Sequence, residues 1–113
     1  MIPFSGAVRA GFAAVVLLFG SGAFGAAADD DIARGGELLT KNCADCHAVG
    51  RTGTSAHKDA PAFRTLSKRY PIESLEESLA EGIMSGHPDM PEFSFDADDV
   101  GAIIAYLNSI QER

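Results

Sequence analysis

Two thiols and an imidazole stand within five consecutive residues, Cys43-Ala44-Asp45-Cys46-His47. This spacing is typical of the site at which a c-type haem is attached. The two thiols can add across the vinyl groups of the porphyrin, and His47 can then bind the iron as its proximal ligand. The alternative is a thiol oxidoreductase or a zinc site. The sequence lacks the βαβ pattern of the first and, beyond His57, an obvious fourth ligand for the second.

The second axial ligand of such an iron would come from one of four residues: Met84, Met90, His57 and His87. Met90 is favoured because it lies in Pro88-Asp89-Met90-Pro91, where a proline restricts the backbone on each side. A thioether is a weak, neutral ligand that favours ferrous iron and raises the reduction potential. Met84 is explained more simply as a core methionine, and His87 as a loop or surface histidine. His57 stands in a polar loop and is expected to be exposed.

An imidazole that binds a metal needs an acceptor for the N–H of its other ring nitrogen. The carbonyl of Pro61, in the loop that follows the motif, is the candidate acceptor for His47. Arg64 and Tyr70 are candidates by position for contacts with the haem propionates. A solvent-facing arginine and a core tyrosine explain these two residues equally well.

The chain has 113 residues, which predicts one domain, residues 29–113, after an amino-terminal segment. Residues 1–28 have the pattern of a secretory signal: a charged Arg9, an apolar run from Ala10 to Phe19, and then small residues. Cleavage is expected between residues 25 and 28, after Gly25 or Ala28. A retained membrane anchor is the alternative, although a span needs about 20 apolar residues and this run is shorter.

All 16 acidic residues but only eight of the nine basic residues follow Ala28, so residues 29–113 carry a formal net charge of −8. No basic patch is visible. Nucleic acids and anionic membrane surfaces are therefore unfavourable partners. A domain of this size buries little apolar surface and usually needs a cross-link, metal or cofactor for stability. A covalently held haem would meet that need.

The apolar pattern predicts an all-α fold of three to four helices joined by loops. The first helix is expected to begin at Asp29-Asp30-Asp31, whose carboxylates suit a helix N-terminus. A loop is expected from Ala48 to Pro61, followed by a short helix over residues 63–69. Pro71 precedes a third helix with an apolar stripe at Ile72, Leu75, Leu79 and Ile83 and an outward face at Glu73, Glu76, Glu77 and Glu81. After a loop over residues 88–95, Asp96 is expected to cap a last helix whose stripe is Val100, Ile103, Ile104, Leu107 and Ile110.

These features together resemble the class I c-type cytochromes, which are small and carry one haem. The resemblance covers nearly all of residues 29–113. It rests on the haem motif, on Ala60-Pro61-Ala62-Phe63, on Met90-Pro91 and on Ile103-Ile104-Ala105-Tyr106-Leu107 in the last helix. The haem motif is strongly specific, whereas the other segments are individually weak but occur in the order of the family. Two departures are Leu39, where the family often has an aromatic residue, and Ala48, where it often has glycine.

The resemblance implies a haem clasped between loops, with the first and last helices crossing at right angles. It places Gly35 at that crossing, opposite Ile103 and Tyr106, with Leu39 packed alongside. It also implies that the Pro61 carbonyl holds the haem histidine and that Met90 is the axial methionine. The haem site would then consist of Cys43, Cys46, His47, Pro61 and Met90, with His47 and Met90 on the iron.

The function expected from this resemblance is that of a monomeric periplasmic electron carrier and not of an enzyme. One haem c, bound through Cys43 and Cys46, would pass single electrons between periplasmic redox proteins. Contact with a membrane would arise only through partner complexes. The alternative is a haem enzyme or gas sensor with a labile sixth ligand, which would require Met90 to leave the iron.

Overall fold

The computed structural model describes residues 2–3, 6–7, 10–17, 20, 23–82 and 88–113. In this part of the chain the elements are α1 (Ala23–Cys43), η1 (Phe63–Lys68), η2 (Ile72–Leu75), α2 (Glu76–Glu81) and α3 (Ala97–Ile110). The described residues contain no β-strand, so the all-α fold class predicted from the apolar pattern is confirmed.

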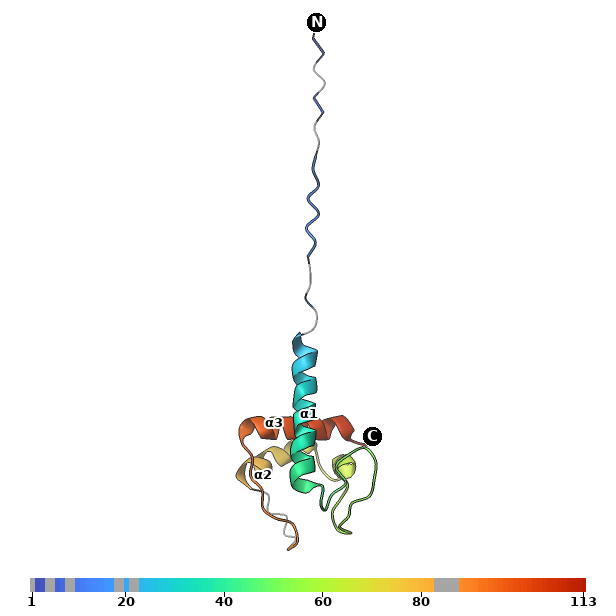
Figure 1. The fold of residues 1–113 in the computed structure, drawn as a ribbon, viewed down its shortest axis with the longest axis vertical. Coiled ribbons are helices and arrows are strands. Elements are labelled where there is room, and N and C mark those ends of the chain that lie inside the picture. The colour runs from blue at the N-terminus through green and yellow to red at the C-terminus, as the bar shows by residue number, and fades with distance from the viewer. Residues whose placement is uncertain (1, 4–5, 8–9, 18–19, 21–22, 83–87) are drawn as a thin grey trace.

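The crossing of α1 over α3 is the principal contact between the described elements (Figure 1). Leu39 of α1 and Ile103 of α3 are both buried in the core at 3% and 0% exposure. The interface is close because Gly35 and Gly36 have no side chain there. A Cβ atom on Gly35 would lie 2.8 Å from the Cβ of Tyr106 and would overlap the carbonyl group of Ala102. The backbones of the two helices are therefore in direct contact.

The two adjacent glycines have different neighbours. The expected neighbour Tyr106 is confirmed for Gly35, but the closest atoms belong to Ala102 rather than to Ile103. A Cβ on Gly36 would lie 2.9 Å from the ring of Tyr106. Each glycine costs about 1 kcal/mol within a helix relative to alanine. The close approach of α3 is the reason that both positions lack a side chain.

The amino terminus of α1 differs from the expectation. The helix begins at Ala23 and not at Asp29-Asp30-Asp31, so these carboxylates lie on exposed inner turns. Alanines at positions 26–28 explain the extension because alanine has the highest intrinsic helix propensity. The helix passes through the predicted domain boundary at Ala28, and both that boundary and the signal segment remain predictions. Among the described residues, no helix is long and apolar enough to cross a membrane.

One face of α3 forms the centre of the core. All five residues of its predicted stripe are buried, and they pack against Leu39, Phe63, Leu66, Ile72 and Leu79. The helix begins as predicted, because the Asp96 side chain accepts a hydrogen bond of 2.9 Å from the backbone N–H of Asp99. Arg34 of α1 forms an ion pair with Asp99, which adds a polar contact at the same crossing.

The third predicted helix is divided in two. Pro71 precedes the 3-10 helix η2, and regular α-helix begins only at Glu76. Helix α2 ends at Glu81, and Gly82 directly after it has a φ of +118°, which is accessible mainly to glycine. The predicted outward-facing glutamates are all exposed, whereas Ile83 lies outside the described residues. The short helix expected over residues 63–69 is present as η1.

The crossing predicts opposite effects at two glycines. Gly35→Ala should lower the free energy of unfolding by about 1–3 kcal/mol, because its methyl group would enter the backbone of α3. Gly101→Ala should raise it by about 0.5–1 kcal/mol, because a Cβ there has no atom within 4 Å and alanine favours the helix. Guanidinium unfolding of the two purified variants, followed by circular dichroism, measures both. A neutral Gly35→Ala change would contradict the close crossing.

Candidate functional site

The haem motif forms one turn at the end of α1. Cys43 is the last residue of the helix, and its carbonyl accepts hydrogen bonds from the backbone N–H groups of Cys46 at 3.2 Å and His47 at 2.9 Å. Both thiols are free and half-buried. Burial, with a smaller effect from Cys46, raises the pKa of the Cys43 thiol to about 11. A redox-active thiol needs the opposite shift, so this environment disfavours the thiol oxidoreductase alternative.

The imidazole of His47 is held on two sides. Its Nδ1 lies 2.7 Å from the carbonyl oxygen of Pro61, the hydrogen bond that the sequence led us to expect. Because a carbonyl can only accept, Nδ1 donates and carries the proton of the neutral ring. Phe63 stacks on the imidazole with the ring centroids 4.6 Å apart. Nε2 is therefore left with an available lone pair, as a metal ligand requires.

The loop between the motif and Pro61 is fastened to the domain at several points. The backbone N–H of Ala48 donates to the Ser55 hydroxyl at 2.9 Å, and the Ala48 carbonyl accepts from the Phe63 N–H at 3.0 Å. The Tyr106 hydroxyl donates to the Val49 carbonyl at 2.5 Å. Tyr106 therefore joins the helix crossing to the segment that follows His47.

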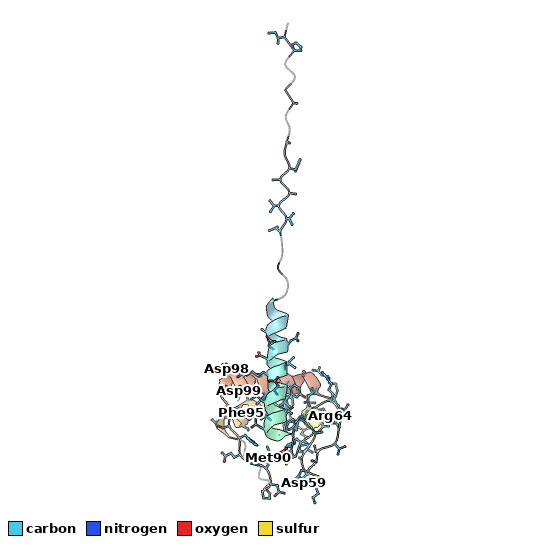
Figure 2. All side chains as sticks on the ribbon, in the orientation of Figure 1. Asp59, Arg64, Met90, Phe95, Asp98 and Asp99 are labelled. Atoms are coloured by element: carbon cyan, nitrogen blue, oxygen red, sulfur yellow. The ribbon has the colours of Figure 1, made fainter. Side chains whose placement is uncertain are left out.

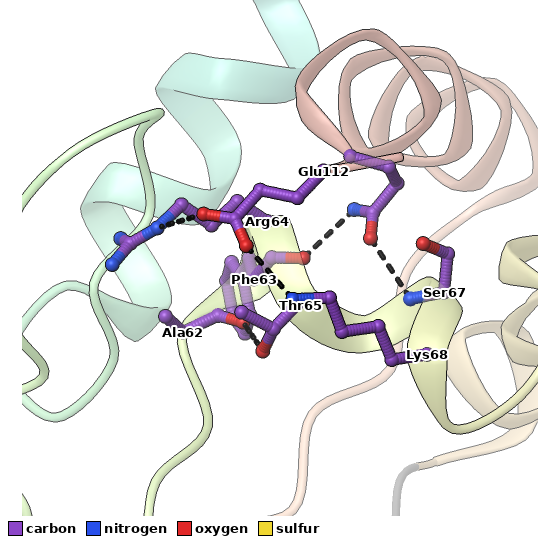
Figure 3. A network of polar contacts seen from close by, with 8 residues as sticks. Ala62, Phe63, Arg64, Thr65, Ser67, Lys68 and Glu112 are labelled. Atoms are coloured by element: carbon purple, nitrogen blue, oxygen red, sulfur yellow. Dashed lines mark hydrogen bonds and ion pairs between the residues drawn. The ribbon is translucent and has the colours of Figure 1, made fainter.

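The carboxyl-terminal tail supports the same side of the site (Figure 3). The Gln111 amide donates to the carbonyl of Phe63 at 2.7 Å, and its oxygen accepts from the Ser67 N–H at 2.9 Å. The backbone N–H of Glu112 donates to the Arg64 carbonyl at 2.8 Å. These contacts hold η1, and with it Phe63, against α3. The sequence contained no signal for them, since the partners are more than 40 positions apart.

Arg64 has a feature that bears on the cofactor. Its Nε forms an ion pair of 3.1 Å with Glu112, but its Nη1 is buried and has no hydrogen-bond partner among the described residues. A buried polar atom without a partner is unusual and costs free energy. The carboxylate of a haem propionate would satisfy it, so Arg64 fits the group. Tyr70, the other candidate from the sequence, is 36% exposed.

The candidates for the second axial ligand are placed unequally. Met90 is half-buried in the segment between α2 and α3, at the end of the domain where α1 terminates (Figure 2). Met84 and His87 lie outside the described residues. His57 was expected to be exposed, but its side chain is only 26% exposed and its Nε2 lies 3.0 Å from a carboxylate oxygen of Asp89. In the described part of the chain, no group of three or more histidine, cysteine or acidic side chains could hold a metal ion.

The amino-acid sequence of this chain is similar to those of several known proteins. Residues 30–107 match the family described as cytochrome c oxidase, cbb3-type, subunit III. Cytochrome c-552 of Bradyrhizobium diazoefficiens is 33% identical over 81 residues, which cover 72% of this chain and 76% of the relative. Cytochrome c6 of Picosynechococcus sp. is 34% identical over 100 residues, which cover 83% and 82%. The chain is a class I c-type cytochrome. No solved structure matches it significantly.

A third relative is larger than this cytochrome. The cytochrome c subunit of the cytochrome bc1 complex of Corynebacterium diphtheriae is 36% identical over 87 residues, which cover 73% of this chain but only 28% of the relative. Membership of the family means that the cofactor is a covalently bound haem c and that the protein functions in electron transfer. The free thiols of Cys43 and Cys46, the available Nε2 of His47 and the unpaired Nη1 of Arg64 fit this group.

The hydrogen bonds of Gln111 to Phe63 and Ser67 predict that this residue stabilises the position of η1 beside the haem motif. Gln111→Ala should lower the free energy of unfolding by about 1–2 kcal/mol, because it removes a half-buried hydrogen bond to Phe63 and a second, exposed one to Ser67. Asn108→Ala is the matched control from the same helix end, where the amide makes one exposed bond of 2.9 Å to Glu73. Guanidinium unfolding should show a distinctly smaller loss for this control. Equal losses would remove the special role of Gln111.

Proposed function

We propose that this cytochrome is a periplasmic carrier of single electrons and that His47 and Met90 are the axial ligands of its haem. The observation that carries the proposal is the 2.7 Å hydrogen bond between His47 Nδ1 and the Pro61 carbonyl. It directs Nε2 of the residue next to Cys46 toward metal binding. A haem attached through Cys43 and Cys46 would then be held by three groups from one turn of chain.

Met90 is proposed as the second ligand on the basis of its surroundings. Pro88 and Pro91 restrict the backbone dihedral angles on both sides of the Asp89-Met90 pair. The segment is fixed at its other end, where the Phe95 N–H donates to the Leu79 carbonyl at 2.8 Å. A weakly binding thioether benefits from such restriction, because less conformational entropy is lost when the sulfur binds.

The residues around the haem have distinct tasks in electron transfer. Haem c, when bound, supplies the one-electron ferric–ferrous couple. The Pro61 carbonyl orients the His47 ring and increases its basicity as a ligand. The thioether of Met90 stabilises the ferrous form and so raises the reduction potential. Two protein ligands leave no open coordination position for a substrate, which favours a carrier over an enzyme.

The periplasmic location rests on the signal pattern of residues 1–28 and on the family cofactor. The partners proposed are redox proteins of the same compartment, with this cytochrome acting as a monomer. Because residues 29–113 have a net charge of −8, association with a basic partner would be accelerated by electrostatic attraction. The alternative, a haem enzyme or gas sensor, would need Met90 to leave the iron.

Met90→Ala tests the ligand and the alternative together. The variant should lose the charge-transfer absorption of thioether-bound ferric haem, its reduction potential should fall, and its ferrous form should bind carbon monoxide rapidly. Met84→Ala should retain the absorption. Persistence of the absorption in Met90→Ala and its loss in Met84→Ala would assign the ligand to Met84. Rapid binding of carbon monoxide by the unaltered protein would favour the gas-sensor alternative.

Replacing Cys43 and Cys46 together by serine should abolish covalent haem in protein exported from a host that matures c-type cytochromes. A pyridine haemochrome spectrum and the intact mass of the unaltered protein measure the haem and the amino terminus in the same sample. We expect one haem per chain and the mass of a polypeptide whose first residue follows Gly25 or Ala28. A mass that includes Met1 would contradict cleavage of the signal and would favour the alternative, in which residues 1–28 are retained as a membrane anchor.

A further inference from the structure

In the described part of the chain, the segment that carries Met90 contacts the haem-motif loop through the side chains of Asp89 and His57. The Nε2 of His57 lies 3.0 Å from an Oδ atom of Asp89, the residue directly before Met90. The two residues are 32 positions apart, so this contact joins two separate loops. It lies at the end of the segment opposite to the Phe95–Leu79 hydrogen bond.

His57 is itself fixed to the haem motif by the main chain. Its backbone N–H donates to the carbonyl of Cys46 at 3.1 Å, and its own carbonyl accepts from the Ala60 N–H at 3.1 Å. The position of this residue is therefore set by the cysteine that attaches the haem. A movement of the motif would be transmitted to His57 through one hydrogen bond.

The ring of His57 is oriented as well. The backbone N–H of Asp59 donates to Nδ1 at 3.1 Å, so Nδ1 carries no proton in this arrangement. The neutral imidazole then has its proton on Nε2, which donates to the Asp89 carboxylate. A hydrogen bond to an ionised acceptor is stronger than one between neutral groups. The contact therefore forms without a positive charge on the ring.

We propose that the His57–Asp89 pair is a latch that positions Met90 for the iron. The proposal rests on the ligation by Met90 argued above. Between Pro88 and Pro91 only Asp89 and Met90 have a freely variable φ, so fixing the Asp89 side chain also limits where the Met90 side chain can point. His57 and Asp89 act as positioning residues, since neither is assigned to the iron.

The size of the effect follows from exposure. The Asp89 side chain is 65% exposed and that of His57 is 26% exposed, so water screens the pair. Loss of the latch should raise the population of protein with Met90 off the iron by about two- to fivefold, the range expected of an exposed polar contact with a charged group. This population is measured by the rate at which carbon monoxide binds to the ferrous protein, because an uncharged probe is insensitive to the charge of the loop.

The test compares matched variants of the full holoprotein. Asp89→Ala and His57→Ala should each accelerate carbon monoxide binding by about two- to fivefold. Asp89→Asn should stay closer to the unaltered rate, since an amide oxygen can still accept from Nε2. Glu92→Ala, which removes a carboxylate two positions after Met90, should leave the rate unchanged.

A double-variant cycle decides whether the two residues act together. The His57→Ala, Asp89→Ala double variant should bind carbon monoxide no faster than either single variant, because the second change removes nothing further. The latch proposal would be overturned if the rate increases of the two single variants multiplied in the double variant. It would also be overturned if Asp89→Ala bound carbon monoxide at the same rate as Glu92→Ala. Retention of the thioether absorption in Met90→Ala would overturn the ligand assignment instead, so the two failures are distinguishable.

Discussion

The direct contact between the backbones of α1 and α3 at Gly35 is the constraint on which the arrangement depends. A side chain at this position would push the helices apart, because the Ala102 carbonyl occupies the space of a Cβ. Cys43 ends α1 only eight residues later, so the crossing determines where the helix delivers the haem motif. Tyr106 extends the constraint, since it packs on Gly36 and also binds the Val49 carbonyl just after the motif.

Helix α3 also supports the site at its carboxyl-terminal end. The tail that follows it binds η1 through Gln111, and η1 presents Phe63 to the ring of His47. Pro61 lies two residues before the start of η1, and its carbonyl accepts the His47 N–H. The proximal histidine therefore depends on contacts from the middle of α3 and from the residue that follows it. Because the apolar core of this domain is small, a covalently bound haem would contribute to the stability of the fold.

The two sides of the proposed haem site are built differently. His47 follows Cys46 directly, and its ring is held by a main-chain carbonyl and by an aromatic stack. Met90 lies in a segment without regular secondary structure, held by prolines, by Phe95 and by the partly exposed hydrogen bond between His57 and Asp89. A weaker framework on the methionine side matches a weaker ligand. It also explains why contacts remote from the iron can matter more on that side.

The sequence by itself determined what depends on residue type and short spacing. The haem motif, the Asp96 cap and the buried stripe of α3 are local patterns, and each was found from them, whereas the place of Gly35 at the crossing was implied by the family resemblance. The tertiary structure decided what depends on meetings of distant segments. The tail on η1, the Arg64–Glu112 ion pair and the His57–Asp89 pair join residues between 32 and 48 positions apart. The start of α1 at Ala23 was also missed, because the alanines before Asp29 continue a helix that the carboxylates suggested would begin there. Short motifs depend only on residues that are close in the sequence. The partner of an exposed polar side chain depends on which distant segments the fold brings together.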